Sequence, residues 1–187
     1  MDSFPVLHTR RLNLIEIKQS HLNDLFNLFS DKEVISYYNL LPYKDIEDAQ
    51  PLLDWFISRY RQGLAVRWGI ALKGSEHIIG TVGFNNYTEN HRANIGYDLQ
   101  KEYWNKGYIT EVLQMVICFG FNELNVNRIE AEVMQGNLAS EKVLEKLRFK
   151  KEGVLREWMY WNGAHYDMTM YSLLKSEYNS SQNPKEP

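Results

Sequence analysis

The segment from Glu102 to Leu113 reads EYWNKGYITEVL and joins a strand-like run to a long helical pattern. The first backbone N–H groups of such a helix have no intrahelical partner, and they lie at the positive end of the helix dipole. Gly107 has no side chain to keep a ligand from these amides, and Lys106 adds a positive charge beside them. The segment therefore predicts a phosphate site, with a simple structural turn as the alternative. The spacing of a nucleotide P-loop is absent.

Alternating and helical hydrophobic patterns predict the elements that position this segment. In order, they are a strand within 7–18, a helix capped by Ser20, a helix over 45–62, strands near 66–72, 78–84 and 93–99, a helix over 107–122, a strand over 128–134, a helix from Asn137 to about Leu147, and strands over 149–160 and 165–174. The three middle strands predict an antiparallel meander. The strands on either side of the 107–122 helix are predicted to be parallel neighbours, because a helix connects them.

The composition is that of an ordinary globular protein with one domain, which we place at residues 1–175. The chain has 187 residues, 44% of them hydrophobic, and a net charge of −3, so nothing favours a nucleic acid or an anionic membrane as partner. No secretory signal or membrane-spanning run is recognised, which predicts a cytoplasmic location. The tail SEYNSSQNPKEP, residues 176–187, has no periodicity and is predicted to be disordered.

The histidines and the single cysteine give no sign of metal or nucleophilic chemistry. The five histidines lack the spacing of a metal site, so no metal is expected. Cys118 cannot form an internal disulfide, and it has no neighbouring histidine in sequence to activate it as a nucleophile.

The segment DLQKEYWNKGYITEVL resembles motif A of the GCN5-related N-acetyltransferases (GNAT), [QR]-x-x-G-x-[GA] at a strand-to-helix turn. It also resembles the Y-W-x-K-G-Y form of the RimJ/RimL-type branch, whose members acetylate ribosomal proteins. Trp104 stands where Gln or Arg is usual, and Ile109 stands where Ala or Gly is usual.

Further patches in the same order strengthen the resemblance, which covers about residues 7–175. They are Arg11-Leu12-x-Leu14, Ile95-Gly96-Tyr97, an N-x-x-S…K-x-G-F motif at Asn137–Ser140 and Lys146–Phe149, and a C-terminal hairpin at Gly153–Glu157, Asn162–Asp167 and Tyr171–Leu174. Arg148 replaces the usual glycine of the third patch, so its turn has to form without glycine's conformational freedom.

The resemblance implies an α/β fold with a central mixed, mostly antiparallel seven-stranded sheet flanked by helices. In that fold the fourth strand, here residues 93–100, splays from the fifth, and the pantetheine of acetyl-CoA pairs with its edge. The implied reaction is direct acetyl transfer from acetyl-CoA to a primary amine. The implied cofactor-binding residues are Leu99, Asn105, Lys106, Gly107, Tyr108, Ile109, Thr110, Asn137 and Ser140.

Two residues are candidates for catalysis. Asn137 and Ser140 are three apart and share a face at a helix start, where a purely structural N-cap is the alternative. The resemblance makes Ser140 a candidate acid for the departing thiolate. Some members of the branch use a glutamate as base where this chain has Met159; Glu157 lies two residues away, on the same face of a regular strand. A solvent-facing charge is the alternative for Glu157.

The acceptor amine must be neutral to attack. An α-amino group with a pKa near 8 is neutral roughly a tenth of the time at pH 7, whereas a lysine near 10.4 is neutral far less often. A protein N-terminus, such as that of a ribosomal protein, is therefore the expected acceptor. The alternatives are a small amine (a polyamine, an amino acid or an aminoglycoside) and a non-catalytic acyl-CoA-binding protein, suggested by Met159. The sequence leaves open whether the chain forms a homodimer.

Overall fold

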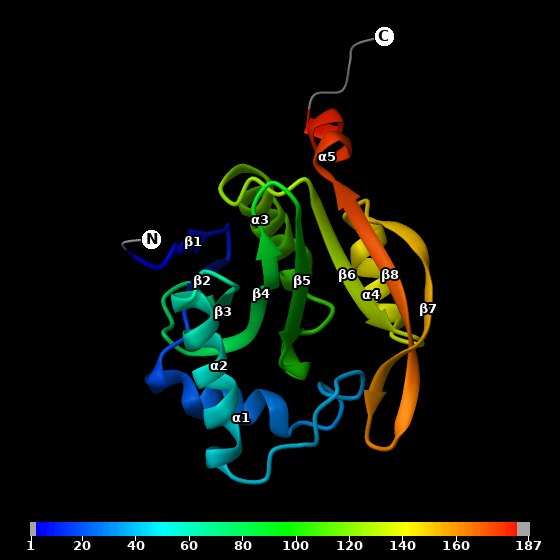
Figure 1. Ribbon diagram of the computed structural model, residues 1–187. Coiled ribbons are helices and arrows are strands. Elements are labelled where there is room, and N and C mark those ends of the chain that lie inside the picture. Colours follow the sequence, from blue (N-terminus) through cyan, green and yellow to red (C-terminus); the bar gives the residue numbers. More distant parts are fainter. Residues whose placement is uncertain (1–2, 183–187) are drawn as a thin grey trace.

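A computed structural model of the protein describes residues 3–182, where eight strands form one sheet in the order β1-β2-β3-β4-β5-β6-β8-β7 (Figure 1). The strands are β1 (Leu7–His8), β2 (Leu12–Glu16), β3 (Val66–Leu72), β4 (Ile78–Thr88), β5 (Arg92–Leu99), β6 (Arg128–Met134), β7 (Lys150–Trp161) and β8 (Ala164–Leu174). Neighbouring strands are antiparallel except β5 and β6, which are parallel. This arrangement confirms the mostly antiparallel sheet, the β3–β4–β5 meander and the parallel pair.

The sheet has eight strands where seven were expected, because the predicted first strand is interrupted. A tight turn in which the Thr9 N–H donates to the Leu12 carbonyl, at 2.9 Å, separates β1 from β2. The two-residue β1 then folds back on β2, with Leu7 opposite Leu14. The extra strand is therefore a short hairpin at the edge of the sheet.

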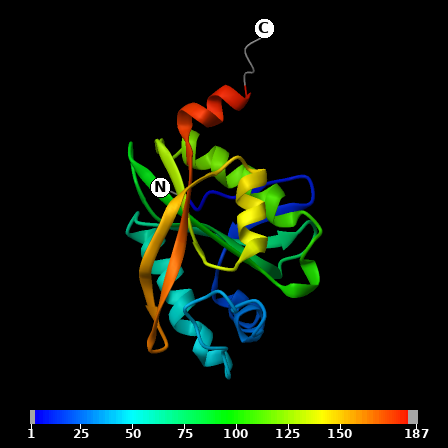
Figure 2. The ribbon, with the colours of Figure 1, turned by 90° about the vertical axis from the view of Figure 1, so that its right-hand side faces the viewer.

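The helices cover both faces of the sheet. They are α1 (Leu22–Ser30), α2 (Gln50–Arg61), α3 (Tyr108–Asn122), α4 (Leu138–Lys146) and α5 (Lys175–Gln182), with short 3₁₀ turns η1 (Gln19–His21), η2 (Ile46–Ala49) and η3 (Lys101–Tyr103). Figure 2 shows α3 and α4 on one side of the sheet and α2 on the other. The larger apolar cluster includes the inner faces of α3 and α4, and the smaller one includes α1 and α2.

Two local predictions differ from the structure, and the position of one proline is explained by it. Ser20 does not cap α1, because the chain first makes the η1 turn and α1 begins at Leu22 without a side-chain cap. Pro51 lies in the first turn of α2, where a proline leaves no helical hydrogen bond unmade. The first part of the predicted disordered tail forms α5, and residues 183–187 lie outside the described residues.

The turn after α4 forms despite the arginine that replaces the family glycine. Arg148 has a φ of +67°, the left-handed conformation that favours glycine. Its N–H still donates to the Glu145 carbonyl at 2.9 Å, and the Phe149 N–H donates to the Leu144 carbonyl at 3.0 Å. The chain therefore ends α4 in the usual way, with the backbone strain that a non-glycine residue brings to this position.

In the described part of the chain, no helix combines the length and apolar character that crossing a bilayer requires.

Candidate active site

The central feature of the molecule is a gap between β5 and β6. Their ladder contains three pairs, from Arg92 with Arg128 to Asn94 with Glu130. Past this point β5 remains paired with β4, where Leu99 lies opposite Gly80, while β6 remains paired with β8, where Met134 lies opposite Met168. Each strand follows its other neighbour, so the two diverge and the gap opens toward their C-terminal ends (Figure 1).

The backbone of Leu99 faces this gap. The N–H of the next residue, Gln100, donates to the Ile79 carbonyl of the neighbouring β4 side at 2.9 Å. Because successive residues of a strand direct their hydrogen-bonding groups to opposite sides, those of Leu99 are directed toward β6. Its carbonyl accepts a hydrogen bond from the Trp104 indole at 2.7 Å. Trp104, which departs from the family motif, therefore ties the end of β5 to the turn that leads into α3.

The turn at Asn105–Gly107 presents free backbone donors at the start of α3. Asn105 and Gly107 both have positive φ, +58° and +75°. The first helical bond runs from the Glu111 N–H to the Gly107 carbonyl at 3.1 Å, and no side chain caps this end. The amides of Tyr108, Ile109 and Thr110 therefore lie outside the helical ladder. This arrangement suits an anion such as a phosphate.

An ion pair from the N-terminal segment holds this turn in place. The Arg11 guanidinium donates to the Glu111 carboxylate at 2.7 Å and to the Lys106 carbonyl at 3.0 Å, and it lies 4.4 Å from the centroid of the Tyr108 ring. The Thr9 hydroxyl also donates to Glu111, at 2.6 Å. Burial raises the pKa of Glu111, but these hydrogen bonds outweigh burial and hold the pKa below its usual value. The Glu111 charge is thus neutralised locally rather than directed at a ligand.

A groove of about 550 Å³ runs from this turn along α3. Its lining residues are Thr9, Arg10, Gly107, Thr110, Glu111, Gln114, Met115, Cys118 and Lys146. Two of these lining residues, Arg10 and Lys146, are cationic. Cys118 lies at its far end, three turns of α3 from Gly107.

The start of α4 is capped by its own chain. The Asn137 side-chain carbonyl accepts the Ser140 N–H at 3.1 Å, which is the N-cap arrangement named as the structural alternative. The Ser140 hydroxyl lies 2.7 Å from the hydroxyl of Tyr97, which comes from β5 on the other side of the gap. Burial raises the pKa of Tyr97 to about 12, although its bond to Ser140 acts in the opposite direction. The pair therefore holds two hydroxyl protons at neutral pH.

Two glutamates on the same face of β6 have different partners. Glu130 is buried and accepts hydrogen bonds from Arg92 and Arg128 at 2.9 and 3.1 Å. Glu132 is two residues further along, where the gap opens, and is half-buried. Its hydrogen-bond partners are neutral: the Trp158 indole at 3.1 Å and the Asn94 amide at 3.5 Å. Among the described residues, no cationic side chain forms an ion pair with Glu132, so its negative charge is not neutralised locally.

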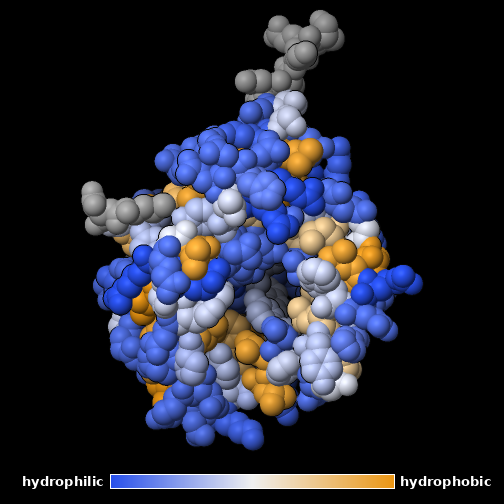
Figure 3. Space-filling model, in the orientation of Figure 1, coloured by the Kyte–Doolittle hydropathy of each residue, from blue (hydrophilic) through white to orange (hydrophobic). Residues whose placement is uncertain are grey.

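The loop between α1 and α2, residues 31–45, contacts both sides of the gap. The Tyr37 hydroxyl donates to the Gly136 carbonyl after β6 at 3.0 Å, and the Tyr38 hydroxyl donates to Asp98 on β5 at 3.0 Å. Asp98 is buried in an ion pair with Arg67 at 2.5 Å. Burial, and then the Asp98 charge, raise the pKa of Tyr38. Figure 3 shows a hollow at this place on the same face, with hydrophobic surface on its rim.

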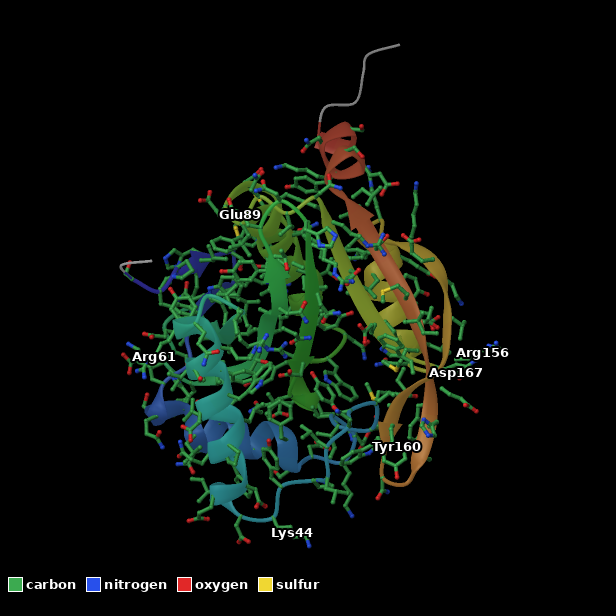
Figure 4. The ribbon with its side chains drawn as sticks, viewed as in Figure 1. Lys44, Arg61, Glu89, Arg156, Tyr160 and Asp167 are labelled. Carbon is green, nitrogen blue, oxygen red and sulfur yellow. The ribbon has the colours of Figure 1, made fainter. Side chains whose placement is uncertain are left out.

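The structure alters the interpretation of Glu157. The pairing of β7 with β8 shifts register between Leu155 and Met159, and Glu157 has a φ of +53° within this bulge. The alternation that would place Glu157 and Met159 on one face is therefore interrupted, and that inference was wrong. Glu157 is exposed, and its N–H donates to the Asp167 carboxylate at 2.8 Å. Figure 4 shows Asp167 and the adjacent Arg156 where β7 and β8 cross, away from the sheet centre.

The structure thus brings together most of the predicted positions and adds others. Leu99, Asn105–Thr110, Asn137 and Ser140 surround the gap and the start of α3, and Glu157 does not. Glu132, Tyr97 and the Arg11–Glu111 pair were not assigned roles from sequence. Arg11 and Tyr97 had a signal, since both belong to motifs of the resemblance, whereas Glu132 lies in an ordinary alternating strand.

Comparison with known proteins places this geometry in context. A family model described as the acetyltransferase (GNAT) domain matches residues 11–150. YoaA, an uncharacterized N-acetyltransferase of Bacillus subtilis (strain 168), is 40% identical over 173 residues, which cover 92% of this chain and 98% of YoaA. The ribosomal-protein-S5-alanine acetyltransferase of Vibrio fischeri is 27% identical, with a TM-score of 0.77 over 92% of this chain and 98% of that one. RimL, a ribosomal L7/L12 alpha-N-protein acetyltransferase solved with coenzyme A, shares the fold at 21% identity, with a TM-score of 0.80 over 92% of this chain and 99% of that one.

Proposed function

The chain belongs to the GNAT family of N-acetyltransferases, and we propose that within this family it acetylates the α-amino group of a protein N-terminus. Acetyltransferases of this fold use acetyl-CoA. We place the whole activity in one domain, residues 1–175, a division supported by the single sheet that contains every described strand. A ribosomal protein is the suggested acceptor, because the structurally similar enzymes from Vibrio fischeri and RimL are ribosomal-protein acetyltransferases.

The uncapped start of α3 supports a site for the diphosphate of acetyl-CoA. The amides of Tyr108, Ile109 and Thr110 have no helical partner, and Gly107 leaves them accessible. The groove that begins here, with Arg10 and Lys146 beside it, suits the phosphorylated adenosine end. In the other direction, the gap beside Leu99 suits the extended pantetheine, which can pair with the open edge of β5.

The observation that carries the amine assignment is the position of Glu132. A carboxylate with neutral partners at the mouth of the gap attracts a protonated amine and can accept its proton. As the amine nitrogen bonds to the thioester carbon and the carbon–sulfur bond breaks, Glu132 takes the proton that the nitrogen loses and passes it to water. The sulfur leaves with the bonding electron pair and gains a proton from Ser140 or solvent. We therefore assign the base to Glu132 in preference to Glu157.

An α-amino acceptor fits the modest strength of this base. Carboxylates are weak bases, which suffices for an amine that is already neutral roughly a tenth of the time at pH 7. The site also has a contact surface for a polypeptide. Trp158 and Tyr160 are both exposed on β7, and the Trp158 indole donates to Glu132 at the gap. Figure 4 shows Tyr160 further along the hairpin of β7 and β8.

The acceptor class can be tested with a matched panel of amines. Peptides with a free N-terminus, the same peptides acetylated at the N-terminus but carrying a lysine, and a set of polyamines, amino acids and aminoglycosides would be compared by thiol release from acetyl-CoA. Mass spectrometry would locate the added acetyl group. We expect turnover with free N-termini only. Turnover confined to the small amines would contradict the proposal, as would binding of acetyl-CoA without turnover on any amine.

The choice of base can be tested with two isosteric substitutions. Glu132→Gln should lower kcat/KM for the amine about 100-fold, the usual size of a lost general base, with acetyl-CoA affinity unchanged. Glu157→Gln serves as the matched control and should change kcat/KM less than twofold. The reverse pattern would return the role to Glu157.

A further inference from the structure

The hydroxyls of Tyr97 and Ser140 meet across the gap between β5 and β6. The ladder between β5 and β6 ends at Asn94, and Tyr97 lies three residues past it, on the open part of β5. Its hydroxyl is nevertheless 2.7 Å from the Ser140 Oγ and 3.4 Å from the Ser140 carbonyl, on the helix that follows β6. The Tyr97 side chain therefore joins the two diverging halves of the sheet at the level of Ser140.

The surroundings of Ser140 fix both its backbone and its side chain. Asn137 caps its N–H at 3.1 Å, which holds the first turn of α4. A serine hydroxyl otherwise rotates freely to suit its neighbours. If the Tyr97 hydroxyl donates to Oγ, the Ser140 proton is left for a third atom, and the atom expected in the gap is the thioester sulfur. When Tyr97 donates to Ser140 in this way, the hydrogen bond that Ser140 gives to the sulfur also becomes stronger.

We propose that Tyr97 is a positioning residue that orients the Ser140 hydroxyl toward the sulfur of coenzyme A. This inference rests on the proposed function, because it requires pantetheine in the gap. Ser140 first donates a hydrogen bond to the departing sulfur and then transfers its proton to it. The hydrogen bond from Tyr97 stabilises the negative charge that this leaves on the Ser140 oxygen. Ser140 then regains a proton from water. The raised pKa of Tyr97, caused by burial, keeps its own proton in place throughout.

The inference predicts a property of the bound product that can be measured without an acceptor. A hydrogen bond donated to a thiolate favours the charged form and so lowers the thiol pKa, which is about 8.5 for a free thiol. The pKa of the thiol in the coenzyme A complex can be followed by thiolate absorbance, with the desulfo-CoA complex subtracted to remove the signal of the tyrosines. We expect the bound thiol to have about a 10-fold larger acid constant than free coenzyme A.

Removing either hydroxyl should return this acid constant toward the free value. Tyr97→Phe and Ser140→Ala are each expected to lower it at least threefold and to lower kcat for acetyl transfer 5- to 10-fold, with the KM for acetyl-CoA unchanged. The double variant should lose no more than Ser140→Ala alone, because both hydroxyls act on one atom. Ser140→Thr keeps a hydroxyl and should retain most of the activity. Tyr87→Phe, at a tyrosine of β4 that packs against the same core, is the matched control and should leave both quantities unchanged.

The possible outcomes separate this inference from the function on which it rests. A Tyr97→Phe variant with the wild-type thiol pKa, or losses that multiply in the double variant, would overturn the role of Tyr97. Failure of the wild-type protein to bind coenzyme A would overturn the proposed function, and this inference with it. If Tyr97→Phe does not fold, site-specific 3-fluorotyrosine at position 97 keeps the donor: a thiol pKa at or below the wild-type value supports the inference, and a return to the free value overturns it.

Discussion

Two helices begin beside the same gap, and their N-termini differ in one decisive respect. At α4 the Asn137 side chain caps the Ser140 N–H, so the chain satisfies its own donor. At α3 no side chain caps the first turn, and Gly107 leaves the amides of Tyr108 to Thr110 accessible. A self-satisfied helix end is a structural device, whereas an unsatisfied one that the rest of the fold holds rigid is suited to a ligand.

The contacts that hold the first turns of α3 and α4 also differ. The turn before α3 is held by Arg11, which comes from the N-terminal segment and bonds both Glu111 and the Lys106 carbonyl. The start of α4 also has distant contacts, from Tyr97 to Ser140 and from Tyr37 to the Gly136 carbonyl, but its capping bond to the Ser140 N–H comes from Asn137 in its own first turn. On the proposed function, long-range support is needed at α3 because its first donors are left for acetyl-CoA. Substitutions at four residues test this comparison.

The largest effect is expected for Gly107→Asp. A carboxylate at this position places a negative charge, and a competing cap, where the diphosphate is expected. The affinity for coenzyme A should fall about 100-fold, or about 2.7 kcal/mol, as measured by calorimetry. Gly74→Asp is the matched control, because Gly74 also has a positive φ, +82°, with nothing within 4 Å of an added Cβ. Equal affinities for the two variants would mean that the start of α3 does not bind the phosphates.

The next effect is expected for Arg11→Ala. This change removes the bonds to Glu111 and to the Lys106 carbonyl, and it leaves the Glu111 charge beside the proposed phosphate site. We expect about a 10-fold loss of coenzyme A affinity, a value consistent with about 1.4 kcal/mol for a charge-assisted hydrogen bond. Arg61→Ala, an exposed arginine at the end of α2 (Figure 4), controls for net charge and should not alter the affinity.

A smaller effect is expected at the capped end, where two variants separate the two roles of Asn137. Asn137→Ala removes the cap and should lower the free energy of unfolding by about 1 kcal/mol. Asn137→Asp keeps an acceptor oxygen and should retain this stability, but it lacks the side-chain N–H group that we propose contacts pantetheine. Both variants should bind coenzyme A only three- to fivefold more weakly. Denaturant unfolding and calorimetry would measure the two quantities, and a 100-fold loss of affinity would erase the contrast with α3.

The smallest effect concerns the pH dependence of stability. The pKa of Glu111 is lower in the folded protein than its ordinary value, so the unfolded state binds its proton first as the pH falls. The stabilisation is complete above the ordinary carboxyl pKa of about 4.5 and is lost as the pH falls through the lower, folded pKa. Glu111→Gln should therefore flatten the loss of unfolding free energy that sets in as the pH falls below the ordinary carboxyl pKa of 4.5. If the unfolding free energy of Glu111→Gln depended on pH as steeply as that of the wild type, the Arg11–Glu111 pair would not contribute to the pH dependence of stability.

Sequence reasoning predicted the local structure of the candidate site where the relevant bonds are local. The turn around Gly107 and the cap at Asn137 follow from residues within four positions of each other, because helix ends are governed by near neighbours. The face of Glu157 was predicted from the alternation of a regular strand, and a bulge between Leu155 and Met159 breaks that alternation, which is why Glu132 is proposed as the base instead. Nothing within β6 distinguishes Glu132 from Glu130.

By itself, the sequence determined the family, the order of helices and strands, the parallel pair and the strand-to-helix turn at Gly107. Only the tertiary structure decided that Arg11 supports this turn from 100 positions away, that Tyr97 reaches Ser140 across the gap, and that Glu130 but not Glu132 has arginine partners. The reason is physical. Hydrophobic period and turn chemistry act over a few residues, whereas the charge that a carboxylate presents depends on which distant side chains the folded sheet brings to it.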